Sequence, residues 1–449
     1  MSSNRSLKNL LHLSESGILA GREPRLVHYM STVSTLVAFL AVVTISPSLR
    51  AGATSIGPLL GVIQASLGGG AIAAGILTAL PCIVFSIMGF AAVPLSRRFG
   101  LTSTLALGMS VSVIGLAARP FASHYGVFLA LSFLALVGPA LGNVIVPAWV
   151  KFHKPGRAVM LITVYGAVLP LGGAIGSLIA VPMAGADGQH WRSAIGFWAF
   201  VALIGALFWL WVWRRVGKDF PPVVPTPRHD DEPKVGVPKL IGEKPRICVK
   251  EPSLMKSPTA IALMLMFGLQ SLGAYVQFGQ LPTILTSMGI DGAQAGAMIA
   301  SINVWSVLGG LVMAPVIDLT NRSNTLPWLA LLFGALTAAG YVTLIIAGRD
   351  LAWFCVTLLA IGGFSFPLAV ALIPARSRSA NIAARLSGMV QPGAYLLAAI
   401  GPVVVGVLLE ATGSTALVLG LLAVSGGAMG IVGYRAAKPS YIDDELAAR

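Results

Sequence analysis

The sequence has few charged residues. Only 10% of its 449 residues are Asp, Glu, Lys or Arg, whereas 56% are hydrophobic. A soluble domain carries about a quarter charged residues, so this deficit argues against a soluble globular protein. Apolar blocks recur along the whole length, which is the pattern of a helical protein that crosses a membrane many times. We therefore expect an all-α membrane protein.

Cysteines and catalytic motifs are also scarce. Two of the three cysteines, Cys82 and Cys355, lie in apolar blocks, and Cys248 lies in a polar segment. This placement indicates neither a disulfide framework nor a metal site. The chain contains no Walker sequence, no cluster of metal ligands and no set of nucleophile, histidine and acid. We therefore expect no enzymatic activity, no metal and no cofactor.

Twelve apolar segments are long enough to cross a bilayer core, for which about 20 residues are needed. Their approximate bounds are 29–60, 71–95, 102–119, 125–149, 158–182, 193–213, 258–285, 294–317, 325–347, 351–374, 386–409 and 414–434. If the N-terminus is cytoplasmic, only three of the thirty Lys and Arg residues lie in outer connections, namely Arg119, Arg192 and Arg349. Arg50 lies within a span, and the other twenty-six are cytoplasmic.

This asymmetry follows the positive-inside rule and predicts a multi-pass protein of the cell membrane with both termini in the cytoplasm. The pI near 10.1 is then explained by membrane topology. We expect no nucleic-acid partner.

One long polar segment, residues 214–257, divides the chain. Because it is rich in Pro, Lys and acids, we expect a cytosolic linker. The linker separates two six-span halves, residues 29–213 and 258–434. Residues 1–28 and 435–449 are then cytosolic end segments.

The two halves repeat each other. Gly75 and Gly296 are 221 residues apart, and so are Pro94 and Pro315. Three further regions repeat at offsets of 220 to 224 residues. Tandem six-helix halves predict a parallel repeat whose axis runs along the membrane normal, with a substrate site between the halves near the middle of the membrane.

Two stretches resemble the signature that major facilitator superfamily proteins carry between helices 2 and 3. The first-half stretch VPLSRRFGLTS (93–103) departs from the signature in having Arg97 at the position of the acid. The second-half stretch APVIDLTNRSN (314–324) keeps an acid and a basic residue. The resemblance implies a conformational latch formed by Arg98, Gly100, Asp318 and Arg322.

A wider resemblance covers residues 29–434. LRAGATSIGPLL in the first span and LPTILTSMGIDGAQAG after the seventh are similar to the cyanate permease and 2-nitroimidazole transporter branch of that superfamily. The resemblance implies the major facilitator fold. It also implies that the arginine of the first stretch, Arg50, faces the substrate.

Arg50 is a permanent cation inside the first span, roughly 8 Å from its midpoint at 1.5 Å per residue. A charge at that depth costs at least about 2.5–3.5 kcal/mol, so we expect its side chain to face a polar cavity. The planar guanidinium suits a carboxylate, a cyanate or a nitro group. The alternative is an arginine that reaches the outer headgroups or pairs with backbone carbonyls.

Acids are absent where Arg50 would need them. All sixteen carboxylates lie in loops, tails or span ends, and only Glu410 comes near a span interior. Arg50 thus lacks an obvious protein counter-ion, which favours an anionic or strongly polar substrate. A dedicated carboxylate that carries protons is not expected. Uniport, exchange and symport with the proton on the substrate remain open.

Polar side chains of other spans complete the predicted substrate site. Tyr275 and Gln277 of the seventh span lie at the depth of Arg50, because Ala274 aligns with Arg50 across the repeat. The other candidates are Gln270, Asn303, Trp305, Asn143, Tyr165, Gln391 and Tyr395. For each of these side chains, bonding between helices is the alternative role.

We therefore predict a secondary active or facilitative transporter that moves a small polar or anionic organic solute by alternating access. The solute is of the cyanate, nitroimidazole or carboxylate kind, and the protein is a monomer in a lipid bilayer. One alternative is a multidrug efflux transporter, which bulky hydrophobic cations as substrates would support. Another is a membrane solute sensor, which absence of solute flux would support.

Overall fold

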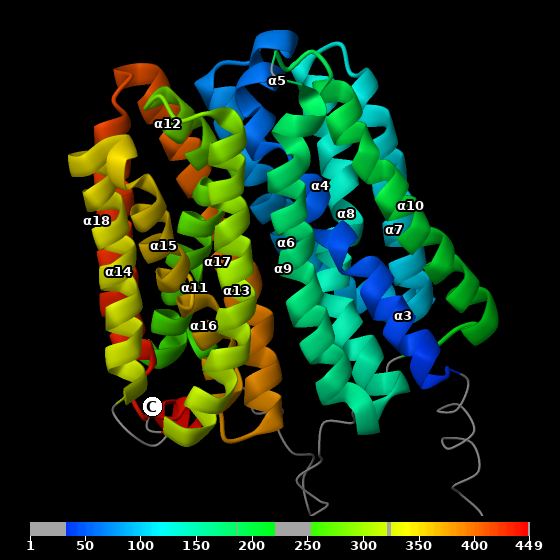
Figure 1. Cartoon of the computed structure of the whole chain (residues 1–449). Coiled ribbons are helices and arrows are strands. Elements are labelled where there is room, and N and C mark those ends of the chain that lie inside the picture. The colour runs from blue at the N-terminus through cyan, green and yellow to red at the C-terminus, as the bar shows by residue number, and fades with distance from the viewer. Residues whose placement is uncertain (1–32, 186, 221–252, 321–324, 448–449) are drawn as a thin grey trace, which may run out of the picture.

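The computed structural model describes residues 33–185, 187–220, 253–320 and 325–447. Within these ranges the chain is helical and contains no strand, which confirms the predicted fold class. The helices form two groups that lie side by side (Figure 1). We call the end of the molecule that carries Phe220 and Ser253 the linker end. The opposite end, where glycines of the two groups pack closely as described below, is called the seam end. Most of the predicted linker, the predicted segment 1–28 and Cys248 lie outside the described residues.

The first group contains the first six crossings. Its first crossing is divided into α3 (Thr35–Ile45), η1 (Pro47–Leu49), α4 (Ala51–Thr54), η2 (Gly57–Leu59) and α5 (Leu60–Leu67). The other crossings are α6 (Ala71–Phe99), α7 (Leu101–Ala118), α8 (Tyr125–His153), α9 (Ala158–Ala184) and α10 (Trp191–Val216). Two short turns, η3 (Arg119–Phe121) and η4 (Pro155–Arg157), connect α7 to α8 and α8 to α9.

The second group contains the other six crossings. They begin with η5 (Leu254–Lys256), α11 (Pro258–Gly279), α12 (Leu281–Ser287) and α13 (Gly292–Thr320). They continue with α14 (Thr325–Ala347), η6 (Gly348–Leu351), α15 (Ala352–Gly362), α16 (Ser365–Ala375), α17 (Ala380–Thr412) and α18 (Thr415–Ala436). The short α19 (Ile442–Ala447) lies at the linker end.

The number of crossings agrees with the prediction. Among the described residues, eleven helical stretches are long and apolar enough to cross a membrane. The longest, Thr325–Ala375, turns back at η6 and therefore crosses twice. The structure thus has twelve crossings in two groups of six.

Each group has hydrophobic cores of its own. Ile145 and Trp149 are fully buried among side chains of the first group. Leu372 and Val390 are fully buried among side chains of the second. Most of the apolar packing is therefore completed within a group.

The break in the first crossing positions Arg50. Pro47 begins the 3-10 turn η1, and Pro58 is the second residue of the 3-10 turn η2; a proline has no N–H to continue the helical ladder. Arg50 lies at the junction of η1 and α4, with a φ of −121°. The Thr54 hydroxyl donates to the Gly173 carbonyl at 2.9 Å, which ties α4 to α9. The irregular backbone around Arg50 is therefore fixed to a neighbouring helix.

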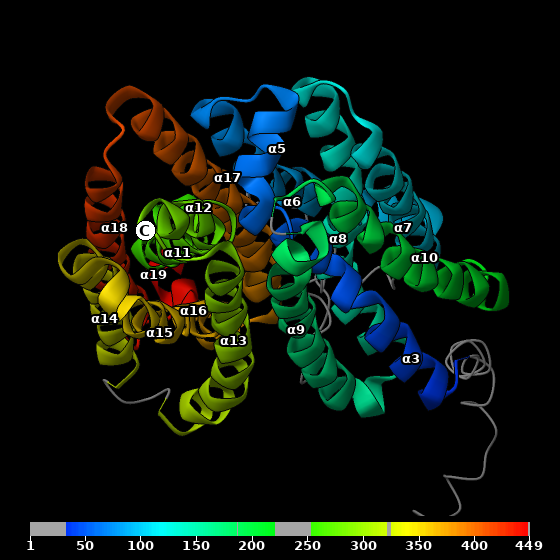
Figure 2. The same ribbon diagram turned by 45° about the horizontal axis from the view of Figure 1, so that its top comes forward.

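Glycines join the two groups at the seam end. A Cβ on Gly75 of α6 would lie 2.6 Å from the Pro402 carbonyl oxygen of α17. A Cβ on Gly296 of α13 would lie 2.7 Å from the Ser177 carbonyl oxygen of α9. Both distances are too short for a real Cβ, so α6 packs on α17 and α13 on α9 with backbone against backbone (Figure 2). We call these two contacts the glycine seam.

A buried carboxylate closes the linker end of the first group. Asp219, which follows α10, accepts hydrogen bonds from the Thr102 backbone N–H at 2.9 Å and the Thr102 hydroxyl at 2.6 Å. Its other contact is His153 at the end of α8, where Nε2 lies 2.7 Å from Oδ2. Asp219 therefore joins the ends of three helices.

Glu445 of α19 has the corresponding role in the second group. It accepts hydrogen bonds from the Ser257 hydroxyl and, at 2.6 Å, from the Thr259 hydroxyl at the start of α11. Burial raises the pKa of Glu445, but these hydrogen bonds and the Arg435 charge outweigh burial and hold that pKa below its ordinary value. The tail is thereby fixed to the second group.

Candidate functional site

A cavity of about 750 Å³ lies between the two groups. Its lining begins at Gly57 and Thr78, beside the glycine seam, and reaches Ile162 and Pro374 toward the linker end. Among the described residues that line it are two arginines, and none is Asp, Glu, Lys or His. The site thus combines fixed positive charge with a wall that carries no ionised acid.

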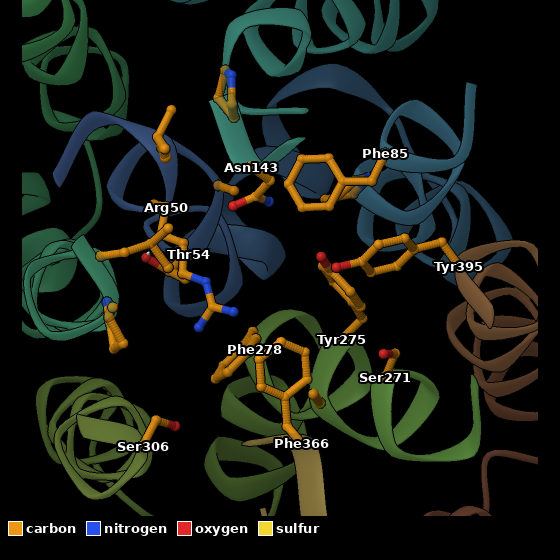
Figure 3. Close-up of a pocket in the computed structure, with 18 of the residues that line it drawn as sticks. Arg50, Thr54, Phe85, Asn143, Ser271, Tyr275, Phe278, Ser306, Phe366 and Tyr395 are labelled. Atoms are coloured by element: carbon orange, nitrogen blue, oxygen red, sulfur yellow. Dashed lines mark hydrogen bonds between the residues drawn. The ribbon is translucent and has the colours of Figure 1, made fainter. Parts of the chain in front are cut away.

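Arg50 extends from the break in the first crossing into this cavity (Figure 3). Its Cζ lies 5.7 Å from the ring centroid of Phe278 on α11, a cation–π contact between the two groups. In the part of the chain that the structure describes, no carboxylate lies within 4.0 Å of its guanidinium nitrogens. The predicted placement of a cation without a protein counter-ion agrees with this geometry.

Five aromatic side chains form a second part of the lining, which we call the aromatic wall: Phe85, Phe267, Tyr275, Phe366 and Tyr395. The ring centroids of Phe85 and Tyr395 are 5.6 Å apart, and those of Phe267 and Phe366 are 5.5 Å apart. Figure 3 shows the hydroxyl groups of Tyr275 and Tyr395 pointing toward the space that the Arg50 guanidinium enters from the other side. A flat solute between them would meet rings and hydroxyls on one side and a cation on the other.

Asn143 and Tyr165 were both predicted in the site, and both line the cavity. The Tyr165 hydroxyl donates to Asn143 Oδ1 at 2.9 Å, which connects α9 to α8. Tyr165 therefore holds the amide of Asn143 in a fixed orientation, with its NH₂ group left to donate elsewhere.

The three predicted glutamines have different surroundings. Gln270 lines the cavity, and so does Gln391, whose Nε2 donates to the Ser387 hydroxyl at 2.9 Å. Gln277 reaches the lining too, but its Nε2 donates to the Tyr341 hydroxyl of α14 at 3.0 Å. The amide of Gln277 therefore forms a hydrogen bond between α11 and α14.

Asn303 and Trp305 are not among the residues that line the cavity, unlike the prediction. Asn303 has 0% exposure, and its Nδ2 donates to the Ile299 carbonyl of its own helix. Its Oδ1 is turned toward Gly173 of α9, at the contact between the groups. Trp305 packs against Phe364, with ring centroids 6.4 Å apart. Both side chains have the predicted depth but point into packing.

The predicted latch is described only in its first half. Arg98 is exposed at the end of α6, with its Cζ 5.4 Å from the Phe99 ring. Gly100 has a φ of +96°, and a Cβ there would lie 3.0 Å from Asp219 Oδ1. The side chain of Asp318 and the whole of Arg322 lie outside the described residues.

The residues that the sequence reasoning missed include Phe85, Phe267, Phe278 and Arg119. Phe278 lies one helical turn after Ala274, as Thr54 does after Arg50, so the repeat itself was a usable signal. Arg119 was predicted in an outer connection, yet it is 1% exposed and lines the cavity. No local pattern marks Phe85, because its span is apolar on all sides.

Comparisons with known proteins agree with this architecture. The sequence profile of the Major Facilitator Superfamily matches residues 38–277. The uncharacterised transporter YycB of Bacillus subtilis (strain 168) is 31% identical over 403 residues, which are 89% of this chain and 93% of YycB. The 2-nitroimidazole transporter of Escherichia coli (strain K12) is 27% identical over 414 residues, covering 92% and 98% of the two chains. The cyanate transport protein CynX of the same organism is 23% identical over 375 residues, covering 84% and 90%.

Solved structures share the fold at low sequence identity. A D-xylose-proton symporter superposes with a TM-score of 0.69 at 13% identity, covering 90% of this chain and 97% of its own. A bacterial homologue of the human lysosomal transporter Spinster, in an inward-facing and occupied conformation, gives a TM-score of 0.65 at 15% identity, covering 91% and 94%. These likenesses concern the fold alone.

The profile covers more than half of the chain, and YycB resembles nearly all of it. The twelve crossings and the cavity between two groups agree with that match, and the predicted resemblance is confirmed. The chain is therefore a multi-pass membrane protein that belongs to the Major Facilitator Superfamily of transporters.

Proposed function

We propose that the protein transports a small polar or anionic organic solute, of the cyanate, nitroimidazole or carboxylate kind, through the cavity between its two halves. The observation that carries this proposal is the Arg50 guanidinium, which enters the cavity without a carboxylate partner among the described residues. A cation in such surroundings binds an anionic or strongly dipolar group more tightly than it would in water, because the local dielectric constant is lower.

The aromatic wall would select the shape of the solute. Rings of Tyr275 and Tyr395 lie across the cavity from Arg50, and Phe278 lies next to the guanidinium (Figure 3). A flat solute can place one edge on the guanidinium and one face on a ring, and its polar atoms can accept hydrogen bonds from the two phenols. Two relatives, a 2-nitroimidazole transporter and a cyanate transport protein, support solutes of this type.

Transport would occur by alternating access of the two halves in a monomer. The close backbone contacts of the glycine seam lie at one side of the cavity, and the lining continues toward the linker end on the other. We propose that the linker end is cytoplasmic, because the basic residues concentrate in the segments that connect there. In this orientation the structure would correspond to an inward-facing state. No acid or histidine lines the described cavity, so a proton that accompanies the solute would travel on the solute.

The test is uptake of radiolabelled cyanate, 2-nitroimidazole and small carboxylates into proteoliposomes. For the solute that is transported, we expect Arg50→Ala to lower uptake by about 10- to 150-fold, the value of a charge-assisted hydrogen bond. Arg50→Lys should retain part of the uptake, since lysine keeps the charge but loses the planar fork. The matched control is Arg349→Ala, which removes an exposed arginine away from the cavity and should leave uptake unchanged.

Wild-type uptake by both Arg50 variants, with normal folding, would contradict the proposed role of Arg50. Flux of bulky hydrophobic cations in place of the three test solutes would favour a multidrug exporter. Binding without any flux would favour a solute sensor.

A further inference from the structure

One exposed carboxylate connects the two halves at the seam end. Glu410 lies two residues before the end of α17, in the second half. Its Oε2 accepts a hydrogen bond at 2.9 Å from the backbone N–H of Ile72, the second residue of α6 in the first half. The first N–H groups of a helix have no partner within the helix, and they carry the positive end of its dipole. Glu410 therefore caps a helix that belongs to the other half.

The close packing of α6 on α17 brings Glu410 to this place. A Cβ on Gly406, one helical turn before Glu410, would lie 2.4 Å from the Ala71 carbonyl oxygen. This distance is too short for a real Cβ, so the start of α6 packs directly on the backbone of α17. A Cβ on Gly70, the residue before α6, would lie 3.0 Å from Glu410 Oε2. The carboxylate thus occupies the space that a side chain at position 70 would need.

The corresponding helix of the second half, α13, has a cap of its own. At the repeat offset of 221 residues, Ile72 corresponds to Ala293. Gly70 corresponds to Asp291. Asp291 Oδ2 accepts hydrogen bonds from the backbone N–H groups of Ala293 at 2.9 Å and Gln294 at 3.2 Å. Gly70 has no side chain that could do the same for α6. The first half therefore lacks the local cap that its repeat has, and the second half supplies one.

The two caps respond differently to a movement of the halves. Asp291 stays beside Ala293 in every arrangement, because both residues belong to the second half. Glu410 and Ile72 belong to different halves, so they separate when the seam end opens. Loss of a helix N-cap disfavours the arrangement that lacks it by about 2- to 30-fold at 25 °C. Opening of the seam end therefore carries a cost at α6 that it does not carry at α13.

We propose that Glu410 is a positioning residue that holds the seam end closed by capping α6 across the two halves. The closed arrangement keeps this cap and the open arrangement loses it, so Glu410 shifts the balance toward the closed one. The proposal rests on the alternating access of the proposed function. It assigns Glu410 no contact with the solute, in agreement with its position outside the cavity lining.

The test measures the distance between two spin labels across the seam end of the purified protein, without solute. The labels are attached to Ser66→Cys of α5 and Ala416→Cys of α18, two exposed positions in different halves. Cys248 is replaced by serine, whereas Cys82 and Cys355 are buried and stay. We expect Glu410→Ala to raise the ratio of the long-distance to the short-distance population by about 2- to 30-fold. Glu410→Gln keeps an acceptor oxygen and should raise it less.

The measurement is repeated in a Gly296→Ala background, in which both arrangements should be populated. The added methyl group would meet the Ser177 carbonyl oxygen at 2.7 Å and thereby weaken the other contact of the glycine seam. The effect of Glu410→Ala on the ratio should be the same in this background.

Two further variants separate the proposed role from a merely structural one. Asp291→Ala is the matched control, since it removes a cap within one half; it should lower Tm and leave the ratio unchanged. The double variant Glu410→Ala with Gly70→Asp gives α6 a local cap, for which the extended backbone of Gly70 is suited, with φ −79° and ψ −177°. It should recover the Tm lost in Glu410→Ala without recovering the wild-type ratio.

An unchanged ratio in Glu410→Ala in both backgrounds would overturn the proposal, and so would recovery of the wild-type ratio in the double variant. An equal shift in Asp291→Ala would also contradict it, because any lost cap would then have the same effect. The distances are measured without solute, so they do not depend on the uptake results for Arg50. Failure of this proposal and failure of the proposed transport function are therefore distinguishable.

Discussion

The two halves contribute unlike surfaces to one cavity. The first half supplies both arginines of the described lining, together with Asn143 and Tyr165. The second half supplies four of the five rings of the aromatic wall, and Phe278 as well. Charge and aromatic surface are therefore separated across the boundary along which the halves would move.

The repeat makes this difference sharper. Both halves interrupt their first helix near the cavity, at η1–η2 in one and between α11 and α12 in the other. The position that holds Arg50 in the first half holds Ala274 in the second. Similar backbone breaks thus carry a cation in one half and a small side chain beside aromatic rings in the other. A solute that uses both surfaces connects the halves, so its binding can influence their relative movement.

The largest expected effect comes from placing a carboxylate on the second-half wall. Ala274 lines the cavity one helical turn from Phe278, whose ring lies 5.7 Å from the Arg50 Cζ. Ala274→Glu should give Arg50 an internal partner and repel an anionic solute, lowering uptake by about 100-fold or more. Ala274→Gln has nearly the same volume without the charge and should transport much better. Equal uptake by the two variants would show that Arg50 and position 274 do not face the same solute.

A smaller effect is expected in the aromatic wall. Tyr275→Leu removes a ring that lies 6.4 Å from those of Phe85 and Tyr395. We expect its KM for uptake to rise about 3- to 10-fold, the range of a lost aromatic contact. Tyr275→Phe keeps the ring and is the matched control. If the KM rises more in Tyr275→Phe than in Tyr275→Leu, the ring itself does not contribute to solute binding.

The smallest effect is expected for Gln277. Its amide donates to Tyr341, so Gln277→Leu should leave the KM unchanged and should lower Tm only slightly. Hydrogen bonds between membrane helices contribute about 0.6 kcal/mol on average. Uptake kinetics measure the KM, and thermal unfolding measures the Tm. If the KM rises as much as in Tyr275→Leu, the amide contacts the solute during transport.

The sequence predicted the depth of residues better than their direction. Arg50 was identifiable because a charged side chain within an apolar span must face a polar cavity or a polar partner. Asn303 and Trp305 have the expected depth, but their side chains face α9 and Phe364. Membrane helices are apolar on nearly all sides, so periodicity does not indicate which side faces a cavity. Tertiary packing determines which side of a helix faces the cavity, and that packing cannot be derived from the periodicity of one sequence.

Asp219 illustrates another limit. The sequence placed this acid in a linker, whereas it returns to the start of α7 and contacts Thr102 and His153. The carboxylate that the first-half signature lacks at Arg97 is thus present from another part of the chain, beside Gly100. Contacts of this kind depend on a loop conformation and leave no spacing pattern.

The glycine seam has an electrical consequence. Backbone packs directly on backbone there. If the linker end is cytoplasmic, as we propose, the membrane voltage would fall mainly across the seam, and Arg50 would lie near the cytoplasmic potential. A charge that crosses the full membrane potential gains or loses about 2.3 kcal/mol per 100 mV. A solute anion that enters from the cytoplasm meets little of that field when it binds. Voltage would therefore act on the conformational change that closes one end of the cavity and opens the other, and hardly at all on the binding of the solute.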